Sequence, residues 1–111
     1  RSLALSGAQI IAHPANLVLP YCQNAMVTRC LENRVFAITA NRTGTEKRGE
    51  DDFSFTGQSQ ITSQKGEILS SAPKDQPYVD ILEIDENLAD NKDLNEYNNL
   101  FKDRRSDCYK I

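Results

Sequence analysis

Few side chains in this sequence could serve as a nucleophile and its base. It holds one histidine, His13, and three cysteines, Cys22, Cys30 and Cys108. A thiol with an imidazole as its base can attack a carbonyl carbon. However, Cys22 and Cys30 fall in a predicted helix among apolar residues, where a buried thiol is inert, and a lone histidine ending an apolar strand is usually structural. We therefore expect no catalytic residue, no metal site and no cofactor in this chain.

Polar residues follow two predicted strands at the point where each strand ends. Asn16 comes soon after the apolar run 9–13, and Asn41 and Arg42 directly follow the run 35–40. The carboxyl ends of parallel strands meet at one edge of a sheet, where open α/β folds bind their ligands. These loops could therefore form one wall of a pocket, with an amide from Asn16 and a cation from Arg42. Alternatively, the asparagines hold turns through their own side chains.

Two arginines have acidic residues nearby in the sequence. Arg42 could bind a substrate carboxylate, whose geometry a guanidinium matches, or it could pair with Glu46 instead. Arg29 and Glu32 lie one helical turn apart, and such a pair usually stabilises a helix rather than acting as acid and base. We expect Arg29 and Glu32 to be structural.

The first part of the sequence alternates between helices and strands. The run 3–5 before Gly7 predicts the end of a helix, 9–13 predicts a strand, and 21–33 predicts a second helix. The run 35–40 is continuously β-prone, which is typical of a strand covered on both faces. Together these elements predict a parallel β-α-β unit with a right-handed crossover. The apolar face of the second helix is expected to be formed by Cys22, Ala25, Met26 and Cys30.

The second part of the sequence is more polar. Residues 41–52 are expected to form a long loop, and 59–62 with 67–70 predict a β-hairpin. Residues 78–84 predict a further strand, and Asp85 is a plausible N-cap for a final helix. The apolar residues of that helix are Leu88, Leu94, Tyr97 and Phe101.

These elements define one α/β domain with a charged tail at residues 102–111. The strand 35–40 needs apolar cover on both faces, yet the sequence supplies only one core helix. We therefore expect another structure to cover the sheet. Left uncovered, that face should make the isolated chain self-associate or bind a hydrophobic dye.

The overall composition excludes two classes of partner. The 111 residues carry 13 basic and 16 acidic side chains, for a net charge of −3, and the arginines are isolated among apolar residues. Binding to nucleic acid is therefore disfavoured. No apolar run approaches the roughly 18 residues of a membrane span, and three cysteines without a CxxC pair indicate a reducing compartment. We expect a soluble cytoplasmic protein with no membrane contact.

Four blocks of the sequence, taken in order, resemble one family. The first is 1–20, and the second is 29–44, which reads R-x-x-E-N, an apolar run and N-x-x-G. The third joins 55–59 (F-x-G-x-S) with 64–67, and the fourth is the D-R-R-x-x-x-Y of 103–109. These blocks resemble the carbon-nitrogen hydrolase, or nitrilase, superfamily in the part that follows its catalytic cysteine.

The resemblance implies a four-layer α-β-β-α sandwich, of which residues 1–111 would be the C-terminal portion of a single carbon-nitrogen hydrolase domain. The family hydrolyses nonpeptide C–N bonds in amides, carbamoyl compounds or nitriles through a cysteine acyl-enzyme, with Glu as base and Lys stabilising the oxyanion. In the family all three residues precede the segment present here. Substrate binding is implied for Asn16, Tyr21, Asn41 and Arg42. A scaffold role is implied for Arg29, Glu32 and Asn33.

Two functions follow as hypotheses. In the first, the chain supplies half of the sandwich and one wall of the acyl-binding pocket of a homo-oligomeric hydrolase, and is inactive alone. In the second, it is a noncatalytic chain that pairs with the N-terminal half or with another subunit through its acidic C-terminal helix and tail.

Overall fold

A four-stranded sheet and one long helix form the main body of the chain. In the computed structural model, which describes residues 1–108, the strands are β1 (Ile10–Ala15), β2 (Phe36–Asn41), β5 (Gln60–Thr62) and β6 (Ile68–Ser71). Their order in the sheet is β1-β2-β5-β6. β1 and β2 are parallel, whereas β2, β5 and β6 are joined in antiparallel pairs. The predicted parallel β-α-β unit and the predicted hairpin are therefore confirmed.

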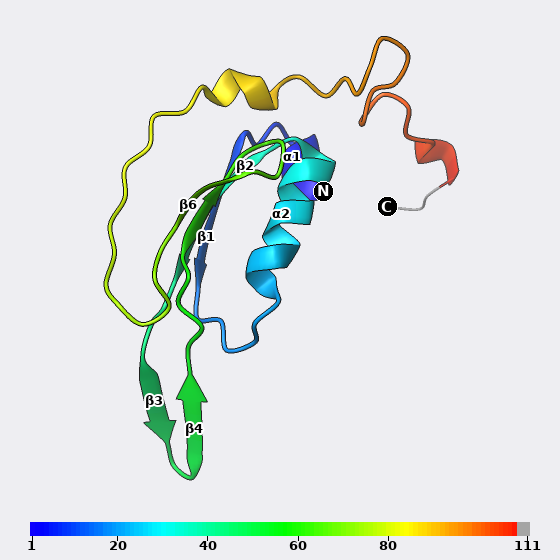
Figure 1. Cartoon of the computed structure of the whole chain (residues 1–111). Coiled ribbons are helices and arrows are strands. Elements are labelled where there is room, and N and C mark those ends of the chain that lie inside the picture. Colours follow the sequence, from blue (N-terminus) through cyan, green and yellow to red (C-terminus); the bar gives the residue numbers. More distant parts are fainter. Residues whose placement is uncertain (109–111) are drawn as a thin grey trace.

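Helix α2 (Cys22–Asn33) packs on one face of this sheet (Figure 1). It ends at Arg34, which adopts a left-handed conformation with φ of 50°. The prediction of an apolar helix face is wrong in part, because Ala25 is exposed and Gln23 is buried in its place. The Nε2 of Gln23 donates to Thr56 Oγ1 and to the Gly57 carbonyl, which offsets part of the cost of burying this side chain, although its Oε1 has no partner among the described residues.

The opposite face of the sheet is exposed. Ile10 and Ile38 are 41% and 42% exposed, and Pro14 and Ala40 are exposed beside them. These residues alternate with the covered ones along each strand, as the two-residue period requires. Figure 1 shows α2 along one side of the sheet, and none of the described helices lies along the other. As expected from the sequence, the described residues cover one face alone.

The predicted loop over residues 41–52 is wrong. Two strands, β3 (Thr45–Arg48) and β4 (Asp51–Ser54), form a separate hairpin that projects away from the sheet (Figure 1). Its turn contains Gly49 with φ of 64°, a conformation that glycine adopts without strain. Opposite charges face each other across the two strands, so a polar composition does not prevent pairing.

Beyond β6, the predicted strand and the predicted helix are both wrong. Residues 78–84 form no strand, because within the described part of the chain no neighbouring strand pairs with their backbone. In the described residues after β6, the regular elements are the 3-10 turns η1 (Glu86–Ala89) and η2 (Ser106–Cys108) and the isolated bridge between Asp93 and Asn99. Asp85 does cap η1, since its carboxylate accepts from the Asn87 backbone N–H at 3.1 Å. The α-helix expected through Leu88, Leu94, Tyr97 and Phe101 does not form.

Asparagine side chains account for the missing helix. The side-chain oxygen of Asn95 accepts the backbone N–H groups of Tyr97 and Asn98, both at 2.9 Å. Asn99 in the same way accepts those of Phe101 and Lys102, also at 2.9 Å. Such local bonds offer the backbone an alternative to helical pairing.

The chain begins with a short helix. Helix α1 (Ser2–Leu5) is short and is followed by Gly7 with φ of 92°, in agreement with the predicted helix end. Among the described residues, no helix has the length and apolarity needed to cross a membrane. Tyr109, with which the fourth sequence block ends, lies outside the described residues.

Candidate functional site

The loops that follow β1 and β2 meet at the carboxyl edge of the sheet. The backbone N–H of Leu17 donates to Oδ1 of Asn41 at 2.8 Å, and the N–H of Arg42 donates to the carbonyl of Ala15 at 3.1 Å. Parallel pairing of the two strands therefore brings the predicted pocket loops side by side.

A third loop, residues 55–59, joins this edge. The Thr56 backbone N–H donates to the Leu17 carbonyl at 2.8 Å, and the Gly57 N–H donates to the Arg42 carbonyl at 3.0 Å. Ser59 Oγ accepts from the Asn41 N–H at 2.9 Å. The three loops thus form one hydrogen-bonded junction, although the third lies far from the first in the sequence.

Asn41 uses its whole side-chain amide within this junction. Besides accepting from Leu17, it donates through Nδ2 to Thr56 Oγ1 at 2.8 Å and to the Gly57 carbonyl at 2.6 Å. Both acceptors come from the third loop. These contacts favour the turn-holding interpretation of Asn41, and direct contact between its amide and a substrate stays a prediction.

Asn16 and Tyr21 are placed differently. Both are exposed, Tyr21 to 64%, and no side-chain hydrogen bond joins Asn16 to another described residue. Tyr21 directly precedes α2 without capping it through its side chain. These two residues, at either end of the loop 16–21, present their side chains to solvent, and their role in binding stays a prediction.

Arg42 is held by neighbours of its own chain. Its guanidinium lies over the Phe55 ring, 4.3 Å from the centroid, and pairs with Glu46. Hydrogen bonds from Arg48 and then Arg42 hold the pKa of Glu46 below its usual value. The expected alternative partner, Glu46, is therefore confirmed. Arg42 also lines a cavity of about 390 Å³ together with Asn41, Ser59, Gln76 and Tyr78.

The cysteines and the histidine do not come together. His13 Nδ1 lies 3.2 Å from Thr39 Oγ1 beneath α2, and no hydrogen bond links it to a cysteine within residues 1–108. Burial raises the pKa of the Cys30 thiol to about 11, which disfavours the nucleophilic thiolate. The expectation of buried free thiols holds for Cys30, whereas Cys22 is only half-buried. No cluster of three potential metal ligands occurs in the described part of the chain.

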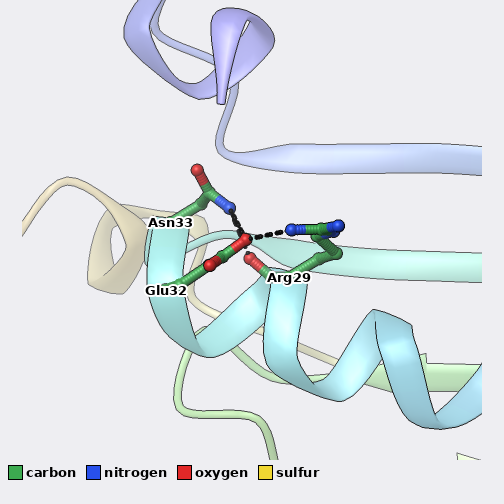
Figure 2. A network of polar contacts seen from close by, with 3 residues as sticks. All are labelled: Arg29, Glu32 and Asn33. Carbon is green, nitrogen blue, oxygen red and sulfur yellow. Dashed lines mark hydrogen bonds and ion pairs between the residues drawn. The ribbon is translucent and has the colours of Figure 1, made fainter.

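Three polar side chains at the end of α2 contact one another and the backbone of the helix. Figure 2 shows Arg29, Glu32 and Asn33, with Arg29 and Glu32 paired at 2.7 Å. The side-chain amide of Asn33 donates to the Arg29 carbonyl at 2.7 Å. The hydrogen bond from Arg29 holds the pKa of Glu32 below its usual value. These contacts close the last turn of the helix and leave no free acid and base.

Three residues of the junction were not identified from the sequence as functional: Gln23, Thr56 and Gly57. Gln23 looks like an ordinary polar residue of an amphipathic helix, and Thr56 like a loop residue. The glycine of the F-x-G spacing in 55–57 was the one sequence feature that pointed to this loop. Gly57 has φ of 56°, and a Cβ there would lie 1.8 Å from the Lys74 carbonyl oxygen. Only glycine fits that close approach.

The structure is that of an α/β protein. A helix covers one face of its sheet, and three loops meet at the carboxyl ends of two parallel strands. The family model for carbon-nitrogen hydrolase matches residues 1–92. This chain belongs to the carbon-nitrogen hydrolase family.

Similar proteins agree with this assignment. The chain is 50% identical over 109 residues to a nitrilase of Pyrococcus abyssi, covering 98% of this chain and 40% of the relative. It is 33% identical to an (R)-stereoselective amidase of a Pseudomonas species, covering 95% of this chain and 37% of that protein. The chain therefore spans about two-fifths of the length of these relatives.

Solved structures share the fold. The NitFhit protein of C. elegans matches with a TM-score of 0.74 and 25% identity, over 96% of this chain and 26% of that one. An amidase of Nesterenkonia AN1 from the nitrilase superfamily matches with a TM-score of 0.58 and 24% identity, over 65% of this chain and 27% of that one. The α/β prediction and the nitrilase-like fold are confirmed.

Proposed function

We propose that this chain is the C-terminal part of a hydrolase that cleaves a nonpeptide C–N bond in an amide, a carbamoyl compound or a nitrile. The family match over residues 1–92 carries the proposal. Cleavage proceeds through a cysteine acyl-enzyme whose Glu, Lys and Cys lie outside this chain. The cysteines of this chain support that assignment, because Cys30 is buried with a raised pKa and no imidazole is bonded to Cys22 in the described residues.

In this proposal the chain forms one wall of the acyl-binding pocket. The loop junction at the carboxyl edge supports it, since three loops are fixed there by hydrogen bonds while Asn16 and Tyr21 keep their side chains free. Asn16 and Tyr21 contact the substrate, and Asn41 and Arg42 shape the wall from behind. Arg42 is already paired with Glu46, which favours an uncharged substrate over a carboxylate-bearing one at this wall.

The names of the relatives support the substrate class. One is a nitrilase and one an (R)-stereoselective amidase. In a structure of a mutant of the Nesterenkonia amidase in which a glutamate is replaced by leucine, the acetamide moiety of fluoroacetamide is added covalently at the active-site cysteine. For the protein that carries this chain we propose that a cysteine thiolate attacks the carbonyl carbon of an amide, that the protonated amine leaves to give an acyl-enzyme, and that water hydrolyses this acyl-enzyme to release the acid. With a nitrile, the thiolate adds to the nitrile carbon, a first water adds and ammonia leaves to give the same acyl-enzyme, and a second water hydrolyses it.

The experiment is an amidase and nitrilase assay on two samples. The isolated 111 residues should show no activity above the blank, and the longer protein that carries them should hydrolyse simple amides or nitriles. Alkylation of every thiol should abolish that activity. Activity that survives complete alkylation would rule out a cysteine acyl-enzyme.

A second candidate function is noncatalytic assembly, and the exposed sheet face favours it. Ile10 and Ile38 lie exposed on that face, as expected of a sheet face that packs against a second sheet. As a noncatalytic chain it would pair through this face either with an N-terminal half, which would complete the α-β-β-α sandwich, or with another subunit. In both cases we propose that the assembled protein is a homo-oligomer. The isolated chain should then self-associate or bind a hydrophobic dye. A dye-silent, sharply melting monomer would contradict this proposal.

We also propose a cytoplasmic location. Cys22, Cys30 and Cys108 are free. Proteins of oxidising compartments more often pair their cysteines, because glutathione is not there to keep thiols reduced. Labelling of the purified protein with a thiol reagent before and after reduction checks this, and a disulfide in freshly isolated protein would argue against it.

A further inference from the structure

The hydroxyl of Thr56 is the centre of the loop junction. It accepts from Asn41 Nδ2 at 2.8 Å and from Gln23 Nε2 at 3.0 Å, and it donates to the Leu17 carbonyl at 3.1 Å. A hydroxyl has one donor and two acceptor positions. All three are in use, so the Thr56 hydroxyl has a single orientation and links the loops after β1 and β2 to the first turn of α2.

The surroundings make this centre rigid. Gln23 is only 8% exposed, and its amide donates a second bond to the Gly57 carbonyl at 3.1 Å. The side-chain amide of Gln60 in turn donates to the backbone carbonyl of Gln23 at 2.9 Å. Removal of the part-buried hydroxyl would take one partner from each of Asn41, Gln23 and the Leu17 carbonyl, and the loss of such a hydrogen bond costs stability.

The network holds Leu17 from both sides of its backbone. The Leu17 N–H is bonded to Asn41, and its carbonyl accepts from both the N–H and the hydroxyl of Thr56. Leu17 directly follows Asn16 and begins the stretch that leads to Tyr21. The start of the exposed loop 16–21 is therefore fixed by hydrogen bonds to Asn41 and Thr56.

We propose that Thr56 is a positioning residue: acting through Leu17, it fixes the loop 16–21 against the sheet edge and so sets the acyl-binding wall. The effect of Thr56 on substrate binding rests on the proposed hydrolase function, whereas its restraint on Leu17 does not depend on that function. Removal of the hydroxyl should loosen the wall while leaving the attacking thiol, which lies outside this chain, as reactive as before.

The test compares Thr56→Val, which removes the hydroxyl at nearly constant shape, with Thr56→Ser, which keeps it. Thr28→Val makes the same change at an exposed position of α2 and is the matched control. In the protein that carries this chain, Thr56→Val should raise KM for a simple amide about tenfold, the factor of one lost net hydrogen bond, with kcat within about threefold. The serine and control variants should stay within about twofold of the wild type.

Two further measurements separate positioning from a general loss of stability. The alkylation rate of the nucleophilic cysteine by iodoacetamide should be unchanged in Thr56→Val. Hydrogen exchange of the Leu17 amide, followed by NMR, should accelerate by about tenfold or more, while amides of β2 keep their protection. If the valine variant does not fold, Thr56→Ala removes the hydroxyl without adding a methyl group in its place and should give the same pattern.

Several results would overturn the positioning role: an unchanged Leu17 exchange rate, equal acceleration of all amides, a fall in kcat at constant KM, or a serine variant that fails to restore KM. A wild-type protein that hydrolyses no amide or nitrile would instead overturn the proposed function. The exchange of the Leu17 amide still decides the positioning role in that case, because it needs no substrate.

Discussion

The first and last parts of this chain are built in different ways. Residues 1–73 contain all six strands and the 12-residue helix α2, so their backbone groups are paired in ladders and helical turns. Residues 74–108 contain two 3-10 turns and the isolated bridge between Asp93 and Asn99. In Figure 1 the later segment leaves the sheet, runs up beside it and passes over the end of the molecule where α2 ends. The first part therefore depends on burial and backbone pairing, and the second on the buried Ala89 and a few side-chain contacts.

Those contacts gather where α2 ends. The Lys92 ammonium donates to the carbonyls of Asn33 and Arg34 at 3.0 and 2.8 Å, which are free acceptors at the end of the helix. Its nitrogen also lies 5.0 Å from the centre of the Phe101 ring. Burial lowers the pKa of Lys92. Lys92 thus ties the later segment to the earlier one, as does the hydrogen bond from Gln9 Nε2 to Asp90 Oδ2 at 2.9 Å.

The largest difference between the two parts should appear when apolar side chains are truncated. Phe36, at the start of β2, is 2% exposed, whereas Val79 is 86% exposed. Phe36→Ala should lower the free energy of unfolding by about 3–5 kcal/mol, while Val79→Ala should change it by less than about 0.5 kcal/mol. Urea denaturation of both variants measures this. Similar losses at the two positions would mean that the later segment also packs into a core.

A second comparison concerns two glycines within residues 1–73. Gly57→Ala would place a Cβ 1.8 Å from the Lys74 carbonyl oxygen, and φ there is 56°. We expect a loss of about 2–4 kcal/mol, from the clash and the left-handed backbone together. Gly44 has φ of 83°, but a Cβ added there would meet no atom within 4 Å, so Gly44→Ala is the control and should lose about 1 kcal/mol. Equal urea midpoints for the two variants would contradict the close approach of residue 74.

Loss of the two hydrogen bonds from Lys92 to the end of α2 should detach residues 74–108 from the rest of the chain, with little effect on the sheet. Lys92→Met leaves two helix-end carbonyls without this donor, and we expect a loss of about 1 kcal/mol in the free energy of unfolding. Limited proteolysis within residues 74–101 should become several-fold faster. Lys102→Met, at an exposed lysine, is the matched control. Unchanged proteolysis in Lys92→Met would show that other contacts hold the segment.

The smallest expected effect is a pH dependence carried by Glu32. Its pKa lies below the usual 4.5 because Arg29 donates a hydrogen bond to the carboxylate. A carboxyl group with a lower pKa in the folded state stabilises the protein above pH 4.5, and that contribution is lost as the pH falls through the folded-state value. Glu32→Gln should therefore make the urea midpoint less sensitive to pH between 5 and about 3.

Asp107 provides the counterpart in the later segment. Its pKa is also lowered by an arginine, Arg105, but the pair is exposed and joins residues only two apart, so it forms in the unfolded chain as well. Asp107→Asn should leave the pH dependence of unfolding unchanged. If Asp107→Asn altered it as much as Glu32→Gln, the division of the chain into two kinds of structure would be wrong.

The same division explains what the sequence could predict. The apolar runs 9–13 and 35–40 correctly predicted two parallel strands, because burial dictates their composition. The charged run 45–54 concealed a hairpin whose strands place opposite charges opposite one another, a pattern that a search for apolar periodicity does not detect. The run 78–84 has strand composition but no pairing partner in the described chain, and propensity without a partner does not make a strand.

For the site, the sequence predicted which loops meet and missed how they are joined. Asn16, Asn41 and Arg42 were identified because parallel strands end at one edge, and the structure brings their loops together. Thr56 and Gln23 act through tertiary hydrogen bonds between segments more than 30 residues apart. Nothing in their local sequence distinguishes them from ordinary polar residues, so only the folded arrangement identifies them.

Covalent labelling tests most directly the claim that this chain shapes the pocket but does not supply the nucleophile. The protein that carries this chain is incubated with fluoroacetamide, digested, and searched by mass spectrometry for the modified cysteine. We expect a single acetamide adduct on a cysteine outside these 111 residues, with Cys22, Cys30 and Cys108 unmodified. An adduct on any of these three, together with loss of hydrolytic activity, would contradict the account.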